Sequence, residues 1–419
     1  MSIGARPAAI IAAALISSSL RVSSNELVLD VAPGAQTLNI AIANAKPGAT
    51  LRLASGVYRG PVVIDRSVNI IGDKASIVDG GAKGHVITVA APDIRVQGLT
   101  VRNSGKELST EDSGIFITAE GDNAHIIGNQ LHHNLIGVYL KGPEDAVVRA
   151  NTIVGRQDLR VNERGNGVHL WNTPGSVVEN NDISFGRDGI FVTTSRDNSF
   201  RNNRFTDLRF AVHYMYTNNS EVSSNVSRGN DVGFALMYST GLKVSSNVSN
   251  GDRDRGIFFN FANQSDIGNN SVRGGVEKCV FIYNSNHNRI HHNHFEACQI
   301  GVHFTAGSEQ NALWANNFIA NRTQVKYVGT RSLEWSRDGH GNYWSDHLAF
   351  DVNGDGVADR PYRPNNLVDQ IIWRHPMAKI LINSPVLQIL QWAQSQFPAL
   401  HPGGVTDSVP LMQPQQTLK

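Results

Sequence analysis

The sequence predicts an all-β protein: a right-handed, single-stranded parallel β-helix with turns of roughly 22–23 residues, followed by a mixed, partly helical C-terminal extension. Three observations predict this fold. An apolar–asparagine pair recurs at nearly constant spacing, apolar residues alternate along the segments between the asparagines, and the chain has only 17% charged residues against 39 glycines. On these grounds we divide the chain into residues 1–24, 25–330 and 331–419.

The recurring pair is an apolar residue three positions before an asparagine. Nine asparagines follow this pattern, and their positions differ successively by 22, 30, 22, 22, 22, 23, 23 and 23: Asn129, Asn151, Asn181, Asn203, Asn225, Asn247, Asn270, Asn293 and Asn316. This period, without helical spacing, predicts three short strands and three bends per turn. Asparagine at one fixed bend tolerates a left-handed backbone, and its stacked amides can hydrogen-bond from turn to turn. The one long step, from Asn151 to Asn181, predicts a surface loop at 157–164.

Charge and hydropathy exclude several classes of partner. Lys+Arg (37) and Asp+Glu (36) nearly cancel, so we expect no nucleic acid partner. Residues 1–24 carry one early cation, Arg6, then an apolar stretch and small polar residues. This pattern is typical of a signal peptide, and a disordered tail is the alternative. No other segment reaches the ~18 apolar residues of a membrane span. We therefore expect a periplasmic protein with no direct membrane span.

The chain has two cysteines, Cys279 and Cys298. In an oxidising compartment they could form one disulfide. A metal pair is the alternative, although spacing of the CxxC type is absent.

Alternate residues of a strand point to opposite sides, so each turn has an inward and an outward set. The outward set is unusually apolar, and it contains Trp171, Phe191, Met215, Met237, Phe258, Phe281 and Tyr283. A contiguous exposed patch of this kind marks a binding surface. We therefore expect the five aromatic residues of this set to bind a partner. The alternative is that the C-terminal segment or the 157–164 loop covers the patch.

Three outward residues predict a copper site. His213 and Met215 are two apart on one strand, and Met237 lies one repeat later, directly above Met215 at ~4.8 Å. Two thioethers and an imidazole suit Cu(I). The alternative is that the methionines pack against a partner. A second group, His287, His291, His292 and His294, flanks a bend and is either a solvent-facing turn or an auxiliary metal site.

The C-terminal extension contains a calcium-like motif and a helix. Asp351, Asn353, Asp355 and Asp359 provide oxygens at positions 1, 3, 5 and 9 of an EF-hand-like loop. Position 12 is Tyr362 instead of glutamate, and an Asx-rich turn without metal is the alternative. Residues 384–397 predict a helix with Ser384 as N-cap, and the tail that follows is rich in proline and glycine.

The rival function is enzymatic, because enzymes that act on polysaccharides use the same fold. Glycoside hydrolysis needs two facing carboxylates, and the outward set contains none. The triplet 339–341, Gly-His-Gly, is similar to a polygalacturonase motif but lies outside the repeat. We predict that the protein is not an enzyme, with a carbohydrate-binding or polysaccharide-modifying β-helix as the alternative.

Long segments between about 200 and 410 resemble the NosD family. They include HYMYTNNSEVSSNVSRGNDVGFALMYS, EKCVFIYN and GNYWSDHLAFDVNGDGVADRPYRPNNLVDQ. The resemblance implies a periplasmic component of an ABC-type system, with NosF as ATPase and NosY as permease. It also implies a role in assembling the copper–sulfur centre of nitrous oxide reductase, with NosL as copper donor. The copper ligands proposed above come from strand geometry and are not carried over from the family.

Overall fold

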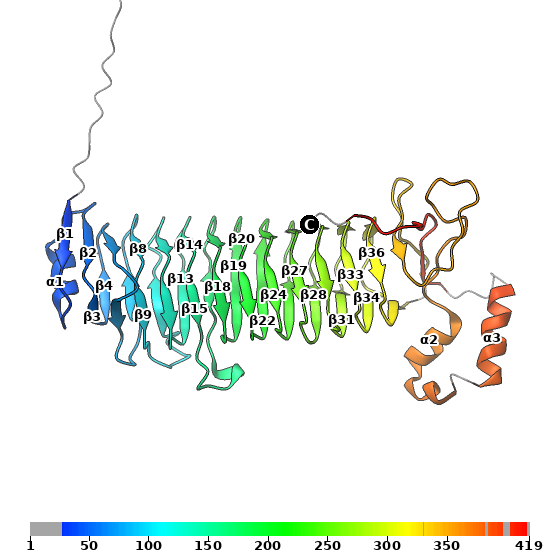
Figure 1. The fold of residues 1–419 in the computed structure, drawn as a ribbon, viewed down its shortest axis with the longest axis horizontal. Coiled ribbons are helices and arrows are strands. Elements are labelled where there is room, and N and C mark those ends of the chain that lie inside the picture. Colours follow the sequence, from blue (N-terminus) through cyan, green and yellow to red (C-terminus); the bar gives the residue numbers. More distant parts are fainter. Residues whose placement is uncertain (1–26, 330, 382–383, 397–402, 417–419) are drawn as a thin grey trace, which may run out of the picture.

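The computed structural model describes residues 27–329, 331–381, 384–396 and 403–416, so the predicted signal peptide lies outside the described residues. The predicted fold is confirmed: the chain winds into a right-handed parallel β-helix that forms a long rod, with a helical segment at one end (Figure 1). Each complete turn contributes one strand to each of three parallel sheets. Strands n and n+3 therefore pair across successive turns for most of the rod.

The three sheets run the length of the rod. Sheet 1 contains β1 (Val28–Val31), β2 (Thr50–Leu53), β5 (Asn69–Ile71), β8 (Arg95–Gln97), β11 (His125–Ile127), β14 (Val147–Arg149), β17 (Val177–Glu179), β20 (Ser199–Arg201), β23 (Glu221–Ser223), β26 (Lys243–Ser245), β29 (Asp266–Gly268), β32 (Arg289–His291) and β35 (Ala312–Trp314). Sheet 2 contains β3 (Gly56–Arg59), β6 (Ser76–Asp79), β9 (Thr100–Arg102), β12 (Gln130–His132), β15 (Thr152–Val154), β18 (Asp182–Ser184), β21 (Arg204–Thr206), β24 (Val226–Arg228), β27 (Val248–Asn250), β30 (Ser271–Arg273), β33 (His294–Glu296), β36 (Asn317–Ile319) and β39 (Tyr343–Trp344). Sheet 3 contains β4 (Val62–Ile64), β7 (Ile87–Val89), β10 (Ser113–Ile117), β13 (Ile136–Lys141), β16 (Val168–Trp171), β19 (Asp188–Arg196), β22 (Phe210–Asn218), β25 (Val232–Met237), β28 (Arg255–Asn260), β31 (Lys278–Tyr283), β34 (Ile300–Thr305) and β37 (Thr323–Val328).

The interior of the rod is a mainly apolar column. The predicted alternation of inward and outward residues is confirmed in sheet 3, since Val212, Tyr214, Phe234 and Leu236 are all fully buried. Parallel strands buried in this way stack equivalent side chains at ~4.8 Å from one turn to the next. Hydrophobic burial along the column therefore fixes which residues of each turn face outward.

The predicted asparagine ladder is confirmed and runs beyond the predicted nine members. Asn203 Oδ1 accepts hydrogen bonds from the backbone N–H and the Nδ2 of Asn181, both at 3.0 Å. Its own Nδ2 donates to Val178 O at 2.9 Å and to Asn225 Oδ1 at 3.0 Å. The ladder continues to Asn342, whose backbone N–H and Nδ2 donate to the Asp407 carboxylate.

One part of that prediction is wrong. The left-handed residue at this bend is the one before each ladder asparagine, as at Asn202 with φ 56° and His292 with φ 54°. The ladder asparagine must turn its amide inward to receive the N–H groups of the neighbouring turn. The sharp bend therefore falls on the exposed residue that precedes it.

Both ends of the rod are covered. Helix α1 (Thr37–Asn44) closes the N-terminal end with the buried side chains of Leu38 and Ile42. At the other end Trp344 stacks on Phe318 at 4.3 Å, with β39 extending sheet 2 beyond residue 330. Strands β38 (Leu333–Glu334) and β40 (Val405–Thr406) pair there and bring in Asp407. Covering the last turn protects the edge strands and the apolar column from solvent.

The C-terminal extension carries three short helices. Helix α3 (Pro385–Gln396) begins where predicted, and Ser384 Oγ accepts a hydrogen bond from the Leu387 N–H. Helix α2 (Leu367–Arg374) and the 3₁₀ helix η2 (Pro376–Leu381) were not predicted. Leu387 packs with Val368 and Ile372 of α2. The helix is only partly buried, since Trp392 is 63% exposed, and residue 397, the last of the predicted helix, lies outside the described residues.

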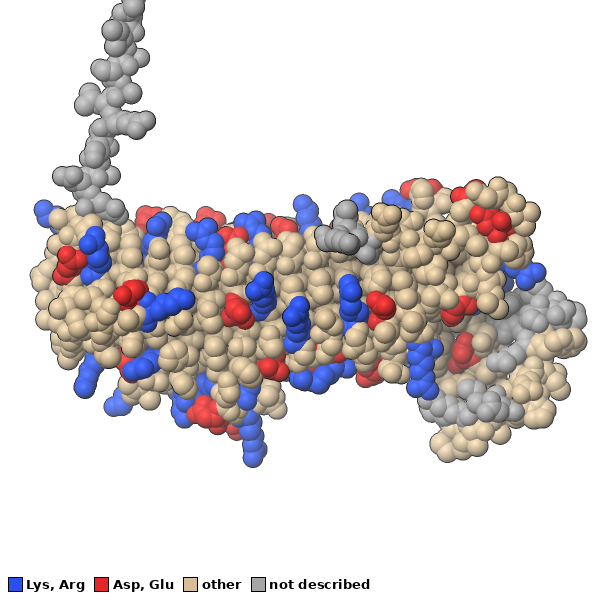
Figure 2. All heavy atoms as spheres, viewed as in Figure 1, with Lys and Arg blue, Asp and Glu red and all other residues tan. Residues whose placement is uncertain are grey.

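Two further sequence features are resolved by the structure. The long step of the asparagine series is a loop between β15 and β16, with a 3₁₀ turn, η1 (Val161–Glu163), and it is joined to the preceding turns by the Lys106–Asp158 ion pair. Cys279 and Cys298 form a disulfide, which decides against the metal pair. Basic and acidic side chains alternate along the visible face of the rod, without a large region of one sign (Figure 2).

Candidate functional site

The outer face of sheet 3 carries a column of aromatic and histidine side chains, interrupted once by an alanine. One residue per turn lies in register: Phe116, Tyr139, His169, Phe191, His213, Ala235, Phe258, Phe281 and His303. Neighbouring rings in this column contact each other with centroids 4.4–5.4 Å apart. We call this set the ring column.

The ring column corrects the prediction of one contiguous exposed apolar patch. Ala235 is fully buried, and His213 is only 9% exposed, because the rings of Phe191 and Phe210 contact it. Phe191, Phe258 and Phe281, predicted to bind a partner, are half-buried in the column. Arg255 lies over Phe258 and covers it further. The exposed predicted residues, Trp171 (42%) and Tyr283 (40%), lie in the neighbouring register column.

That neighbouring column contains the two predicted copper-ligating methionines. Met215 of β22 and Met237 of β25 are direct register partners, and both are half-buried. His213 is two residues before Met215 on the same strand, and its ring points outward because Val212 and Tyr214 fill the core. The structure thus brings the three predicted side chains to one place on the outer face.

His213 has a partner that the sequence did not reveal. Its Nδ1 lies 3.0 Å from Oδ2 of Asp188, a fully buried carboxylate one turn earlier. Arg209 donates to both oxygens of Asp188, at 2.8 and 2.6 Å. Burial raises the pKa of Asp188, but the hydrogen bonds from His213 and Arg209 outweigh it and leave that pKa below its usual range.

The ionised Asp188 carboxylate fixes the tautomer of His213. A carboxylate can only accept, so Nδ1 of His213 carries a proton, and in the neutral imidazole Nε2 then keeps its lone pair. Metal-ligating histidines characteristically donate their second ring N–H to a carboxylate in this way. The signal in the sequence was the aspartate at the start of the β19 strand, just over one turn before His213 in the chain.

A second group of exposed aromatic residues also escaped prediction. Three aromatic residues each come one position after a residue of the register column that contains the two methionines: Tyr216, Tyr238 and Phe261. Their side chains are 53%, 39% and 40% exposed. Their rings stack at 5.1 and 5.3 Å, and Phe261 contacts Tyr283 at 6.1 Å. We call these four residues the aromatic stripe. The spacing of the first three, one per repeat, was visible in the sequence.

The other predicted metal residues are placed differently. In the Asp351 loop, Oδ1 and Oδ2 of Asp351 accept backbone N–H groups from Gly354 and Gly356 at 2.7 and 2.8 Å. The Asp355 and Asp359 carboxylates also accept hydrogen bonds, from the backbone N–H groups of Val357 and Val352 respectively. The histidine group divides: His291 and His292 contact each other, whereas His294 bonds Glu296 at 2.9 Å.

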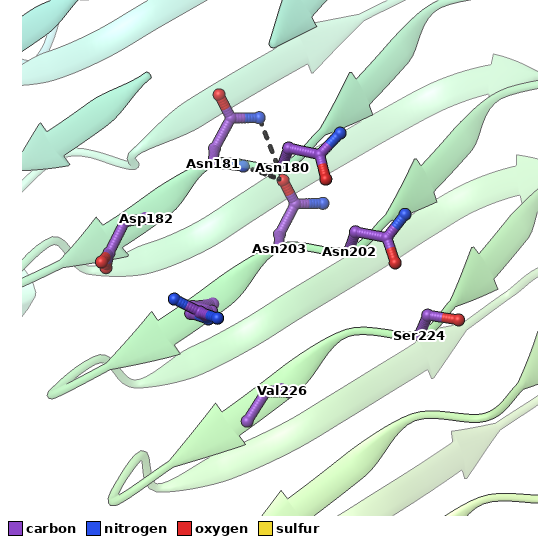
Figure 3. Close-up of a pocket in the computed structure, with 8 residues that line it drawn as sticks. Asn180, Asn181, Asp182, Asn202, Asn203, Ser224 and Val226 are labelled. Carbon is purple, nitrogen blue, oxygen red and sulfur yellow. Dashed lines mark hydrogen bonds between the residues drawn. The ribbon is translucent and has the colours of Figure 1, made fainter. Parts of the chain in front are cut away.

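Within the described part of the chain, no three side chains drawn from His, Cys, Asp and Glu converge on a metal position. None of the helices in that part has the length and apolarity to cross a membrane. A shallow depression of about 390 Å³ lies on the outer face of sheet 2, between Asn180, Asn202, Arg204 and Ser224 (Figure 3). Asp182 is the one carboxylate among the residues that line it, so a facing acid pair is missing there.

Comparison of the sequence with known proteins identifies its family. The sequence model of the NosD family, described as periplasmic copper-binding protein, matches residues 149–349. A protein of Stutzerimonas stutzeri called probable ABC transporter binding protein NosD is 39% identical over 86% of each chain. Its namesake from Pseudomonas aeruginosa is 42% identical over 90% of this chain and 93% of its own. The chain belongs to the NosD family. These relatives are named as binding proteins and not as enzymes.

Solved structures similar to this NosD-family chain share its fold at low identity. The family 28 exopolygalacturonase of Yersinia enterocolitica superposes with a TM-score of 0.56 at 11% identity, over 71% of this chain and 78% of its own. PfbA, a surface adhesin of Streptococcus pneumoniae, gives a TM-score of 0.56 at 7% identity, over 69% and 86%. These likenesses concern the β-helix architecture alone.

Proposed function

We propose that this member of the NosD family is a periplasmic, non-enzymatic accessory protein that carries copper as cargo. In this proposal it works with an ABC transporter in assembling the copper–sulfur centre of nitrous oxide reductase. The observation that carries the proposal is the group formed by Asp188, His213, Met215 and Met237. Its support from relatives is the copper-binding description of the family and the transporter-binding names of two members.

The chemistry of the group suits Cu(I) that must be taken up and released. Thioether sulfurs and a neutral imidazole are ligands that Cu(I) accepts, and they exclude hard cations, which need oxygens. Asp188 holds the His213 ring so that Nε2 can bind. The three ligands come from one face of a rigid sheet, and Met215 and Met237 are partly exposed, so a partner can approach from the methionine side and supply the remaining ligand. An open site of this kind permits exchange, whereas a closed four-ligand site retains its metal.

Competitive Cu(I) titration against a chromophoric chelator tests the site. We expect Met215→Leu/Met237→Leu to lower Cu(I) affinity at least tenfold, because leucine keeps the volume and removes sulfur. Met377→Leu is the matched control, since Met377 is 77% exposed on the C-terminal extension. Unchanged affinity in the double variant would refute the ligand assignment.

The aromatic stripe supports a docking role beside the copper site. We propose that it receives the copper donor, NosL, and then the acceptor, nitrous oxide reductase. Exposed tyrosines are enriched at interface hot spots. Tyr216→Ala/Tyr238→Ala should therefore slow copper transfer from the donor without changing Cu(I) affinity in isolation. Transfer at the wild-type rate in stopped-flow measurements would contradict this role.

The C-terminal helices support attachment to the transporter, which we propose to be the permease NosY with its ATPase NosF. Six apolar side chains on η2 and α3 are more than half exposed: Met377 (77%), Ile380 (79%), Leu381 (54%), Val386 (66%), Ile389 (63%) and Trp392 (63%). Patches of this kind usually bind proteins. Ile380→Asp/Ile389→Asp should abolish co-purification with the transporter. Val352→Asp, at a position 83% exposed in the Asp351 loop, is the control.

The Asp351 loop remains a predicted calcium site. Asp351, Asn353, Asp355 and Asp359 lie on one loop, and the pKa of Asp351 is lowered by the hydrogen bonds it accepts from the Gly356, Gly354 and Asp355 N–H groups. Calcium would have to displace some of these bonds. We expect millimolar Ca²⁺ to raise the Tm, and Asp351→Asn to remove that rise. Equal Tm values with Ca²⁺ and with EGTA would refute the site.

A further inference from the structure

A pair of neighbouring histidines lies at the bend between β32 and β33, away from the methionine site. The Nδ1 atoms of His291 and His292 are 3.0 Å apart, and the two ring planes are nearly perpendicular at 85°. His291 is the last residue of β32, and His292 has a left-handed backbone with φ 54°. His292 is exposed, so solvent reaches the pair directly.

The His291 ring is held in position from three sides. It lies between its register partners Gly268 and Trp314, and it stacks on the indole of Trp314 at 4.7 Å. A Cβ at position 268 would lie 2.7 Å from Cε1 of His291, so glycine provides the space for the ring. Oδ1 of Asp266 lies 3.1 Å from Nε2, while the other oxygen of Asp266 pairs with Arg289 at 2.5 Å.

This arrangement leaves one ring nitrogen of His291 ready to bind. The Asp266 carboxylate accepts the Nε2–H, so the Nδ1 lone pair points toward His292. In the metal-free protein the two Nδ1 atoms share one proton in a hydrogen bond, so a bound metal would replace that proton while His292 takes the tautomer with its proton on Nε2. With metal–nitrogen bonds of about 2.0 Å, a 3.0 Å separation corresponds to an N–metal–N angle of about 95°.

We propose that His291 and His292 form a two-imidazole site for Cu(II). An angle near 90° is that of neighbouring ligands in tetragonal coordination, which Cu(II) prefers, and it is far from the linear arrangement of two-coordinate Cu(I). Water or anions complete the coordination, so the site is open and exchanges its metal. The site is built from different residues and a different sheet from the Cu(I) site. It therefore stands whether or not the proposed Cu(I) function does.

The chain contains a natural control for this inference. His132 and His133 repeat the pair at the end of β12, with Nδ1 atoms 3.1 Å apart and φ 55° at His133. There, however, the residue beneath His132 is Arg102, which pairs with Asp79 at 2.8 Å. Arg102 thus stands where Gly268 stands beneath His291, and a guanidinium there disfavours an added cation. Loss of the outer-shell carboxylate alone typically costs 10–100-fold in metal affinity.

Titration of the full chain with copper sulfate, followed by EPR at one equivalent, tests the site. We expect a tetragonal Cu(II) signal with hyperfine structure from two nitrogens. His292→Asn should remove it and lower Cu(II) affinity at least tenfold. Asparagine keeps the backbone preference, since Asn180, Asn202 and Asn269 occupy the same bend of other turns with positive φ.

His133→Asn is the matched control and should leave the signal and the affinity unchanged. Met215→Leu/Met237→Leu should also retain Cu(II) binding, which separates this site from the Cu(I) proposal. An unchanged signal in His292→Asn, an equal loss in His133→Asn, or no Cu(II) binding by the wild type would overturn the inference.

Discussion

Replacing Asp188 by asparagine tests whether the Asp188 carboxylate orients the His213 ring. The carboxylate is fully buried, and it accepts from His213 Nδ1 at 3.0 Å and from Arg209 at 2.6–2.8 Å. Asparagine keeps the shape but loses the charge, so it no longer fixes the proton on Nδ1 of His213. The ring can then adopt the other tautomer, or rotate, and Nε2 is less available as a ligand.

Two separate losses follow from this geometry. Removal of an outer-shell carboxylate lowers metal affinity by about 10–100-fold, or about 1.4–2.8 kcal/mol. The free energy of unfolding also falls by roughly 1–3 kcal/mol, because Arg209 loses a buried charged acceptor. Arg209→Gln gives the second loss without the first, since it removes the arginine and keeps the Asp188–His213 bond.

Competitive Cu(I) titration and urea denaturation of both variants measure the two effects independently. Asp188→Asn should lose affinity and stability, whereas Arg209→Gln should lose stability and keep Cu(I) affinity within about twofold. If Asp188→Asn binds Cu(I) as tightly as wild type, the carboxylate does not position His213 for a metal. If both variants lose affinity equally, the effect is one of folding.

Three further predictions concern the rod. Asn203→Ala removes four buried hydrogen bonds and should cost about 4 kcal/mol in urea denaturation, at about 1 kcal/mol for each bond. The exposed Asn202→Gly should change stability by less than about 0.5 kcal/mol. Burial, with Lys326 and Lys278 nearby, lowers the pKa of His303 to about 4. As the pH falls from about 6.5 to 4, His303 therefore binds a proton in the unfolded chain but not in the folded protein, so the free energy of unfolding falls over that range. His303→Phe should reduce this loss, which urea denaturation at about pH 7 and pH 5 measures. Reduction of the Cys279–Cys298 disulfide, or its replacement by two alanines, should lower stability by about 3 kcal/mol for a loop of this length.

The fold could be predicted from the sequence because the sequence is periodic. A nearly constant step with asparagine at a fixed position determines which residues stack, and that register alone placed Met237 over Met215. The inward set followed from alternation within strands. The exposure of the outward set did not follow, because exposure depends on whether neighbouring rings cover one another. Tyr139 is outward yet only 2% exposed for this reason.

The contacts that the sequence did not predict join residues of different turns that occupy different positions within the repeat. Asp188 begins β19 and reaches forward to His213 of β22, so the pair is not aligned in the repeat. Asp407 closes the asparagine ladder from 65 residues away, and its place there depends on the path of the C-terminal chain. Periodic patterns predict contacts between equivalent positions, and they say nothing of contacts that cross the register.

The state of the buried Asp188 carboxylate bears on the choice between metal binding and glycoside hydrolysis. A glycosidase needs one carboxyl group that holds a proton and a second that remains ionised, facing each other across a substrate groove. On the outer face of sheet 3, Asp188 is instead committed to Arg209 and His213, and both bonds lower its pKa and keep it ionised. An aspartate held in this state cannot act as the acid, but it can orient an imidazole. In the function proposed above, the outer face of sheet 3 presents a histidine beside two methionines, the donors that a soft metal prefers.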